Sequence, residues 1–280
     1  MNCESIDLEK IVRDLGEARV VPYLGPGALA LCGPHGVPST PPVLCAGLTR
    51  RVGVPHKIRS RLTQAAQFIE NFKHRKTLVT LMNEAFAATA APSALHLALA
   101  RCAAPLVVDT WYDDTMLAAL RCGRPQADWG QVQALAQSEH FGTWTQAYDA
   151  AGTAVDEPLA AWCTLLYRPI GGRSPAGNYL VSDSDFVEVL TEIDIQTPIP
   201  ARVQELRKGR SFLFLGCRFD DQLTRAFARQ IMKRSSATHW AVLPETPTRM
   251  EARFLQEQGI VRIEMPLAQA AQRLFETACI

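Results

Sequence analysis

Short apolar runs alternate with longer amphipathic segments along most of the chain. Runs of β-branched and aliphatic residues predict strands at residues 19–24, 104–109, 162–167, 211–216, 239–244 and 260–265. Apolar residues three and four positions apart predict helices between these strands, as at Leu62, Ala65, Ala66, Ile69 and Phe72. Alternation of strands and helices is typical of a parallel sheet with helices on both faces. We therefore expect an α/β fold.

Capping residues mark where several of the expected helices begin. Asp7 can cap a helix over residues 8–15. Ser182 with Asp185, and Thr248 with Glu251, have the spacing of capping boxes. Further helices are expected near residues 62–72, 78–86, 94–102, 113–121, 223–231 and 267–277.

The length is compatible with one large domain or with two small ones, since domains usually hold roughly 100–200 residues. The 280 residues are 48% hydrophobic, which is sufficient for a sizeable core. We expect a single α/β domain over residues 1–280 with a helical insertion at residues 40–91. Residues 123–158 are weakly patterned and largely polar, so we expect a surface insertion there.

Composition narrows the classes of partner and ligand. A formal net charge of +1 gives no reason to expect nucleic acid or a membrane surface as a partner. The N-terminal segment lacks a secretory pattern, and no run approaches the roughly 18 apolar residues of a membrane-spanning helix. The eight cysteines include no CxxC pair. We therefore expect reduced thiols, a cytoplasmic location and no zinc.

The ends of four predicted strands are the places where chemistry is expected, because ligands of open parallel sheets bind beyond the carboxyl ends of the strands. The first strand ends in Gly25-Pro26-Gly27-Ala28, whose glycines allow close approach of the backbone to a phosphate. The other three strand ends read VVDTWYDD (107–114), LLYRPIGG (165–172) and LFLGCRFDDQ (213–222). Each segment alone is compatible with a simple turn or helix start.

Together and in this order, the strand ends resemble the sirtuin-like family in its bacterial, non-deacylase branch. Gly25–Gly27 is similar to the family's glycine–alanine–glycine loop over the dinucleotide, and Gly36–Pro38 is similar to its GIP-type segment. The stretches PSALHLALA (92–100) and FLFLG (212–216) look like the bacterial branch. The resemblance spans nearly the whole chain and implies a Rossmann fold that binds NAD. Short proteins of this branch associated with nitrogen-fixing bacteria are also similar, which implies a setting and no activity.

The resemblance implies cofactor contacts at three of the strand ends. The residues at these matching positions are Gly25, Pro26, Gly27, Ala28, Asp109, Thr110, Asp113, Gly216, Cys217 and Arg218.

Three positions depart from the family's pattern. Trp111 stands where the family has the asparagine that handles the nicotinamide riboside, and an indole offers only a donor N–H. Ile170 aligns with the family's histidine base, and an aliphatic side chain cannot accept a proton. Arg218 replaces the serine of the family's Gly-X-Ser motif. The paired CxxC zinc ribbon of protein deacylases is also absent from the sequence.

A displaced catalytic base and a phosphate clamp are the remaining sequence-level hypotheses. His35 follows the glycine loop and is the one histidine kept as a candidate base, with a solvated loop histidine as the alternative. Arg168, Arg173 and Arg218 follow strands and could clamp a phosphate. Salt bridges to the aspartates at 113, 220 and 221 are the alternative. The basic stretches at 50–61 and 207–210 are expected to be solvated helix faces, and either of them could also meet an acidic partner.

The departures favour a pseudoenzyme that binds an adenine nucleotide of the ADP-ribose or NAD type, or a protein partner. The resemblance by itself implies NAD hydrolysis or deacylation, so an active NAD hydrolase stays an alternative. A second alternative is an assembly protein, such as a homo-oligomer, that binds no nucleotide. Release of nicotinamide from NAD distinguishes the enzyme from the two other functions.

Overall fold

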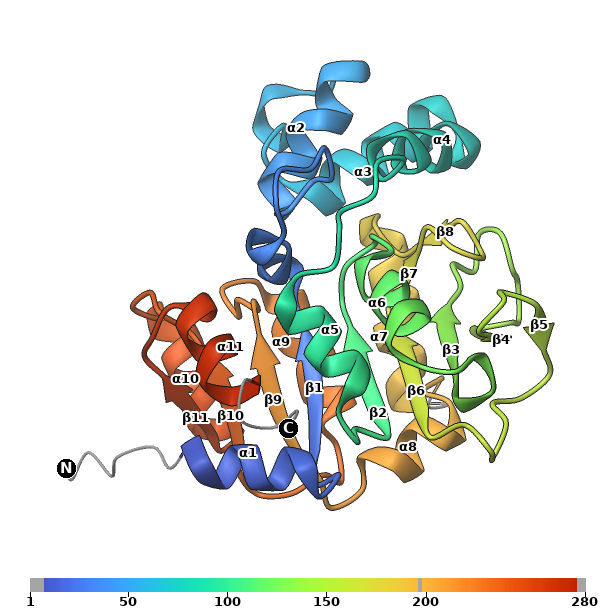
Figure 1. The fold of residues 1–280 in the computed structure, drawn as a ribbon. Helices are drawn as coiled ribbons and strands as arrows, with labels where there is room; N and C mark the ends of the chain where they lie inside the picture. The colour runs from blue at the N-terminus through green and yellow to red at the C-terminus, as the bar shows by residue number, and fades with distance from the viewer. Residues whose placement is uncertain (1–7, 196–197, 276–280) are drawn as a thin grey trace.

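The computed structural model describes residues 8–195 and 198–275, and it confirms the α/β fold with a mostly parallel sheet (Figure 1). Within these ranges, a nine-stranded sheet has the order β11-β10-β9-β1-β2-β6-β3-β4-β5. The strands from β11 to β3 are parallel, and β4 and β5 add an antiparallel edge. The strands are β1 (Val20–Leu24), β2 (Leu106–Asp109), β3 (Trp129–Ala134), β4 (Thr145–Asp149), β5 (Ala154–Val155), β6 (Thr164–Arg168), β9 (Ser211–Leu215), β10 (His239–Val242) and β11 (Ile260–Ile263). A separate hairpin pairs β7 (Gly171–Gly172) with β8 (Asn178–Tyr179).

Helices cover both faces of this sheet and create two hydrophobic cores. The first face carries α1 (Leu8–Gly16), α5 (Ala94–Arg101), α6 (Thr115–Gly123) and α11 (Leu267–Phe275). The second face carries α7 (Asp183–Ile195), α8 (Ala201–Arg207), α9 (Gln222–Ile231) and α10 (Arg249–Glu257). Successive strand residues point to opposite faces, so Val20 of β1 joins the first core while Val21 joins the second.

Pro22 is tolerated inside β1 because of where the pairing of this strand begins. A proline has no N–H to donate to a sheet ladder. Pro22 is in register with Leu213 of β9, whereas pairing with β2 starts one residue later, at Tyr23. The proline therefore precedes the part of β1 that is paired on both sides.

A group of helices lies beyond the carboxyl ends of the strands, at the top of Figure 1. It consists of α2 (Pro41–Arg51), the 3₁₀ helix η2 (His56–Ile58), α3 (Leu62–Lys73) and α4 (Arg75–Ala85), which lie within residues 40–91. The predicted apolar positions Ala65, Ala66 and Ile69 of α3 are fully buried, whereas Phe72 is largely exposed and stacks on Phe68. We refer to α2, η2, α3 and α4 as the helical module.

Residues 123–158 differ from the expected surface insertion. After the 3₁₀ helix η3 (Gln126–Asp128), β3 lies inside the sheet between β6 and β4, and all its residues are buried. The sequence did not predict this strand, because two of its six residues are glutamines, Gln131 and Gln133, and such a composition is typical of a solvent-exposed segment. Their side chains are fully buried, and the amide of Gln133 donates to the side-chain oxygen of Gln131 at 3.0 Å.

Both predicted capping boxes are present. The Ser182 N–H donates to the Asp185 carboxylate at 2.9 Å, and the Asp185 N–H donates back to the Ser182 hydroxyl. The Thr248–Glu251 box has the same reciprocal bonds at the start of α10. The predicted cap Asp7 lies outside the described residues. No helix in the ranges 8–195 and 198–275 is long and apolar enough to cross a membrane.

Candidate functional site

The carboxyl ends of β9, β1 and β2 lie side by side near the centre of the sheet (Figure 1). Leu24 is in register with Leu215 on one side and with Asp109 on the other. The chain leaves β1 toward one edge of the sheet and leaves β9 toward the other. Ligands of doubly wound sheets bind at such a change of direction. The predicted segments 25–28, 109–113 and 216–218 therefore meet where a ligand is expected.

The glycine loop after β1 is held against the end of β9. The Gly25 N–H donates to the carbonyl oxygen of Leu215 at 3.0 Å, and the Gly27 N–H donates to that of Gly216 at 2.9 Å. A Cβ atom would lie 2.6 Å from the Gly216 oxygen at Gly25 and 2.8 Å from it at Gly27. The glycines thus permit contact between two loops, and these two amides already have protein acceptors. Pro26 then begins a 3₁₀ helix, η1 (Pro26–Leu31), in which Ala28 is buried.

The loop after β9 depends on the same contact. Gly216 has a φ of +69°, and a Cβ atom there would overlap the backbone nitrogen of Ala28. The neighbouring Cys217 is buried, and its thiol donates to the carbonyl oxygen of Tyr23 at 3.5 Å. Burial raises the pKa of the Cys217 thiol far above its usual value. Cys217 therefore behaves as a small apolar side chain under the glycine loop.

Trp111 occupies a closed aromatic environment beyond β2. Its indole N–H donates to the carbonyl oxygen of Pro38 at 2.7 Å, which links it to the segment that resembles the family's GIP motif. Its ring packs edge to face against Phe86 and lies 5.0 Å from the ring of Tyr112. Only 4% of Trp111 is exposed. The indole fills this space and has used its single donor.

The polar residues around Trp111 bond mainly to the backbone. The Thr110 N–H and hydroxyl both donate to the carbonyl oxygen of Leu24, at 2.9 and 2.7 Å. Asp113 is buried and accepts from the Thr115 N–H at 2.8 Å at the start of α6. Asp109 is also buried, and its carboxyl accepts from the Trp111 N–H at 3.3 Å.

Asp109 is the buried carboxyl with the most perturbed ionisation at this site. Burial raises its pKa from 3.8 to about 8, and the neighbouring charge of Asp113 adds to the rise while Arg168 opposes it. The carboxyl is therefore largely protonated near neutral pH. A neutral acid beneath the loops adds no negative charge that would repel a phosphate.

Ile170 lies in the hydrophobic core with 8% of its surface exposed. Its carbonyl oxygen accepts from the Leu180 N–H at 3.0 Å, next to the β7–β8 hairpin. The side chain therefore contributes packing at the position where the resemblance places the base.

Both ring nitrogens of His35 are engaged by the backbone. Nδ1 accepts from the Val37 N–H at 3.2 Å, and Nε2 lies 3.2 Å from the carbonyl oxygen of Leu29, which can only accept. These partners fix the neutral tautomer with the proton on Nε2. The remaining lone pair on Nδ1 is already used. In this arrangement His35 shapes its loop and offers no free acceptor to a reaction.

Arg168 is an internal ion-pair residue and is not placed to clamp a ligand phosphate. The guanidinium is fully buried and donates to Asp114 at 3.1 Å, to the carbonyl oxygen of Ser174 at 2.9 Å and to that of Tyr112 at 3.1 Å. Arg173 lies 3.9 Å from the same aspartate and is partly exposed. The partner is thus Asp114, in place of the aspartates at 113, 220 and 221 suggested by the sequence.

Arg218 is the predicted arginine that combines a fixed position with solvent access. Its guanidinium donates to both carboxylate oxygens of Glu251, at 3.0 and 2.9 Å, and lies 3.5 Å from Glu245. Glu251 is completely buried, and its bonds with Arg218, Thr248 and Phe219 lower its pKa to about 2, against the effect of burial. The side chain of Arg218 keeps 38% of its surface exposed.

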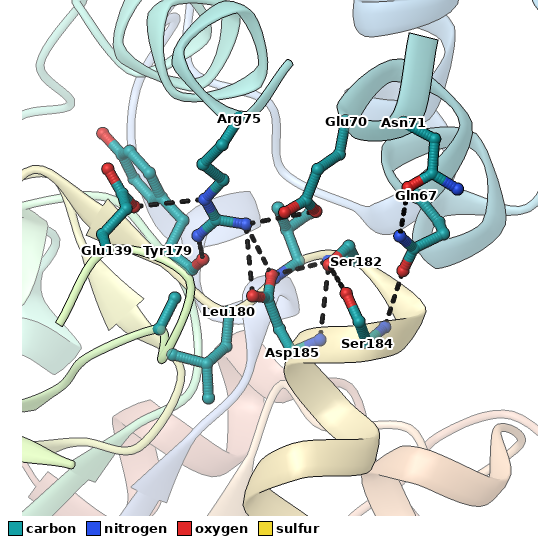
Figure 2. Close-up of polar contacts among 12 residues, drawn as sticks. Gln67, Glu70, Asn71, Arg75, Glu139, Tyr179, Leu180, Ser182, Ser184 and Asp185 are labelled. Atoms are coloured by element: carbon teal, nitrogen blue, oxygen red, sulfur yellow. Dashed lines mark hydrogen bonds and ion pairs between the residues drawn. The ribbon is translucent and has the colours of Figure 1, made fainter. Parts of the chain in front are cut away.

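An ionic cluster that the sequence did not reveal joins the helical module to the body of the fold. Figure 2 shows Arg75, the first residue of α4, between carboxylates from three other segments. It donates to Asp185 at 2.9 Å and to Glu139 at 3.1 Å, and it lies 3.5 Å from Glu70. A further bond of 2.6 Å goes to the carbonyl oxygen of Tyr179 in β8.

The cluster continues along α3 and α7. The Ser184 N–H donates to the side chain of Gln67 at 2.7 Å, so α3 also receives a bond from the start of α7 (Figure 2). The acidic members come from distant parts of the sequence, and no short motif could have linked them. These contacts fix the helical module to the body of the fold.

The described residues give no indication of a metal centre. Within 8–195 and 198–275, no three histidine, cysteine, aspartate or glutamate side chains are grouped in a way that could hold a metal ion. The described cysteines at 32, 45, 122, 163 and 217 take part in no disulfide.

Comparison with known proteins places this arrangement in a family. The SIR2-like domain matches residues 105–263, which cover β2 to β11 and more than half of the 280 residues. The comparison with curated proteins gave no match. The matched segment contains two of the three strand ends that form the site. On this match and on its fold, the chain belongs to the SIR2-like family.

Proposed function

We propose that this SIR2-like protein does not cleave NAD and that its cleft serves a binding role. The observation that carries the proposal is the burial of Trp111, whose indole N–H is bonded to Pro38 and whose ring is packed against Phe86. The resemblance aligns this residue with the asparagine that handles the nicotinamide riboside. A buried aromatic ring at that position leaves neither the space nor the hydrogen-bonding groups that nicotinamide needs.

The residues that would supply acid–base chemistry support the same proposal. Ile170 cannot take a proton, and His35 has both ring nitrogens engaged. A general base is worth about 10²–10⁴ in rate. A chain that lacks both the base and the nicotinamide pocket is expected to release no nicotinamide.

We propose an adenine nucleotide without nicotinamide, such as ADP-ribose or ADP, as the ligand of this cleft. The site lies at the change of direction of a doubly wound sheet, next to a half-exposed arginine that is suited to phosphate. NAD itself fits less well, because its nicotinamide end would meet Trp111. Membership of a nucleotide-related family supports this choice.

The second candidate function is assembly without a nucleotide. It is favoured by the bonds of the Gly25 and Gly27 amides to the end of β9, since amides that already have acceptors add nothing to phosphate binding. In this case the loops after β1 and β9 pack only on each other, and the protein acts through a partner or a second copy of itself.

Titration calorimetry with NAD, ADP-ribose and ADP distinguishes the two functions. For nucleotide binding we expect heat with ADP-ribose and ADP and weaker binding of NAD. Arg218→Gln should weaken binding about tenfold or more, because a hydrogen bond to a charged group contributes about 1.5–3 kcal/mol. Glutamine can still donate to Glu251, which limits damage to the fold.

Arg253→Gln is the matched control for this titration. Arg253 also bonds a glutamate on α10, at 2.7 Å, but it lies on the outer surface. Unchanged affinity in this control, with a loss in Arg218→Gln, supports the strand-end site. The absence of heat with all three ligands at millimolar concentration would end the nucleotide proposal and leave assembly.

A further inference from the structure

A second concave site lies at the amino ends of the strands β10 and β11. The α9–β10 loop and the α10–β11 loop enclose a hollow of about 400 Å³ beside the first residue of β10. Its lining includes Arg229, Lys233, Arg234, Ser235, His239 and Gly259. The glycine loop lies at the carboxyl ends of the parallel strands, whereas this hollow lies at their amino ends. The hollow is therefore separate from the candidate nucleotide site.

The charge of the hollow is positive in a chain whose formal net charge is only +1. Three of the lining side chains are cationic, and Glu257 is the carboxylate among them. Glu257 is already bound by Arg253 at 2.7 Å and lies 3.9 Å from Arg229. Lys233 and Arg234 are exposed, and neither has a carboxylate within 4 Å in the part of the chain that the structure describes. These two cations therefore lack a balancing anion.

A buried cation lies behind the hollow. Arg207, at the end of α8, is 2% exposed and donates to the carbonyl oxygens of Gln230 and Ile231 at 2.8 and 2.9 Å, where α9 ends. Its Nε atom is buried without a hydrogen-bond partner, and no described carboxylate pairs with the guanidinium. Burial lowers the pKa of Arg207, and the charge of Arg234 lowers it further. An anion near Arg234 would relieve this repulsion as well.

Hydrogen bonds of His239 and a close backbone approach at Gly259 position the loops that line the hollow. The Phe212 N–H donates to Nδ1 of His239 at 2.9 Å, which leaves the proton of this buried imidazole on Nε2, 3.4 Å from the Ser235 hydroxyl. Gly259 has a φ of +63°, and a Cβ atom there would overlap the carbonyl oxygen of Ala237. The two loops therefore meet closely because residue 259 is a glycine.

We propose that this hollow binds a small phosphate-bearing anion through Lys233 and Arg234. The volume lies within the range of small-molecule sites, and unpaired cations are the groups that hold phosphate. Single-stranded nucleic acid is a poorer occupant, because its binding platforms need aromatic side chains for base stacking. The hollow offers only the imidazole of His239, which is buried.

Calorimetry with pyrophosphate at low ionic strength tests the proposal. We expect the wild-type protein to bind pyrophosphate. The double variant Lys233→Gln/Arg234→Gln should bind it with an affinity lower by about tenfold or more. The matched control is Lys73→Gln/Lys76→Gln, which removes the same charge from exposed positions on the helical module. The control should bind as the wild type does. Equal losses in both double variants, or no binding by the wild type, would overturn the proposal.

Two further arms separate this site from other sources of the signal. The titration is repeated with Arg218→Gln, which removes the phosphate contact proposed for the strand-end site. Pyrophosphate binding that persists in this variant and is lost when Lys233→Gln/Arg234→Gln is added supports the hollow, whereas complete loss in Arg218→Gln alone would assign the binding to the strand-end site. A single-stranded oligonucleotide should bind more weakly than pyrophosphate does. Tighter oligonucleotide binding that is lost in Lys233→Gln/Arg234→Gln would replace the small anion by nucleic acid.

Discussion

Replacement of Arg75 by methionine should destabilise the fold far more than the loss of an ordinary surface charge. Arg75 is 12% exposed and pairs with Asp185, which is 1% exposed, so its removal leaves a buried carboxylate without its cation (Figure 2). Removal of one partner from a buried ion pair costs about 3–5 kcal/mol. Asp185 also accepts the N–H groups of Val181 and Ser182. Because these two bonds remain, we expect a cost of about 3 kcal/mol, at the lower end.

Arg51→Met is the matched control on the same module. Arg51 bonds Glu84 at 2.7 Å, but the two side chains are 63% and 50% exposed. Exposed pairs contribute about 0–1 kcal/mol. The free energy of unfolding in urea, followed by tryptophan fluorescence, should therefore fall much more in Arg75→Met than in Arg51→Met. Equal and small losses of the free energy of unfolding in the two variants would refute the claim that Arg75 anchors the helical module to the body of the fold.

Three further predictions concern a buried carboxyl, two glycines and the metal content. Because the pKa of Asp109 is raised from 3.8 to about 8, the folded state binds a proton that the unfolded state releases, and stability is lost as pH rises through that window. Asp109→Asn should remove this pH-dependent loss of the free energy of unfolding, which is on the order of 5 kcal/mol. Unfolding measured at several pH values tests this, and a pH profile unchanged from that of the wild type would contradict the role of Asp109. Gly209→Ala should cost about 1–2 kcal/mol for its φ of +71°, and Gly216→Ala about 1–3 kcal/mol more because of the overlap with Ala28; equal unfolding midpoints would argue against that contact. Elemental analysis of the purified protein should find no stoichiometric zinc, and one equivalent per chain would contradict the cysteine pattern.

Local signals in the sequence were sufficient for much of the fold. The capping boxes at Ser182 and Thr248 are read within four residues, and both are present. The parallel strands of the centre are continuous apolar runs, because both of their faces are covered by helices. β3 was missed since its buried glutamines bond to each other and to the backbone, and such partners come from the tertiary structure.

The candidate site was predicted in its location but not in its contacts. The order of the strand ends was enough to bring Gly25, Asp109 and Gly216 together, because parallel strands end at one edge. The acceptors of the glycine amides and the partner of Arg218 lie far away in sequence. Glu251 follows Arg218 by 33 residues, and periodicity carries no information about such a pair.

The same limit applies to Trp111 and His35. The sequence showed that Trp111 is an unusual residue at its position, but its bond to Pro38 spans 73 residues. His35 was a candidate base because it follows the glycine loop. Its hydrogen bonds to Leu29 and Val37 are short-range in sequence, yet they depend on how the loop turns.

Release of nicotinamide from NAD tests the central claim most directly. The purified protein is incubated with NAD, and free nicotinamide is quantified against a buffer blank and against a known NAD hydrolase. Trp111 is buried where the resemblance places the family's asparagine, and neither Ile170 nor His35 offers a free acceptor, so we predict no release above the blank. Steady release that rises in proportion to protein concentration, and that is lost in His35→Ala, would contradict the account and assign the base to His35.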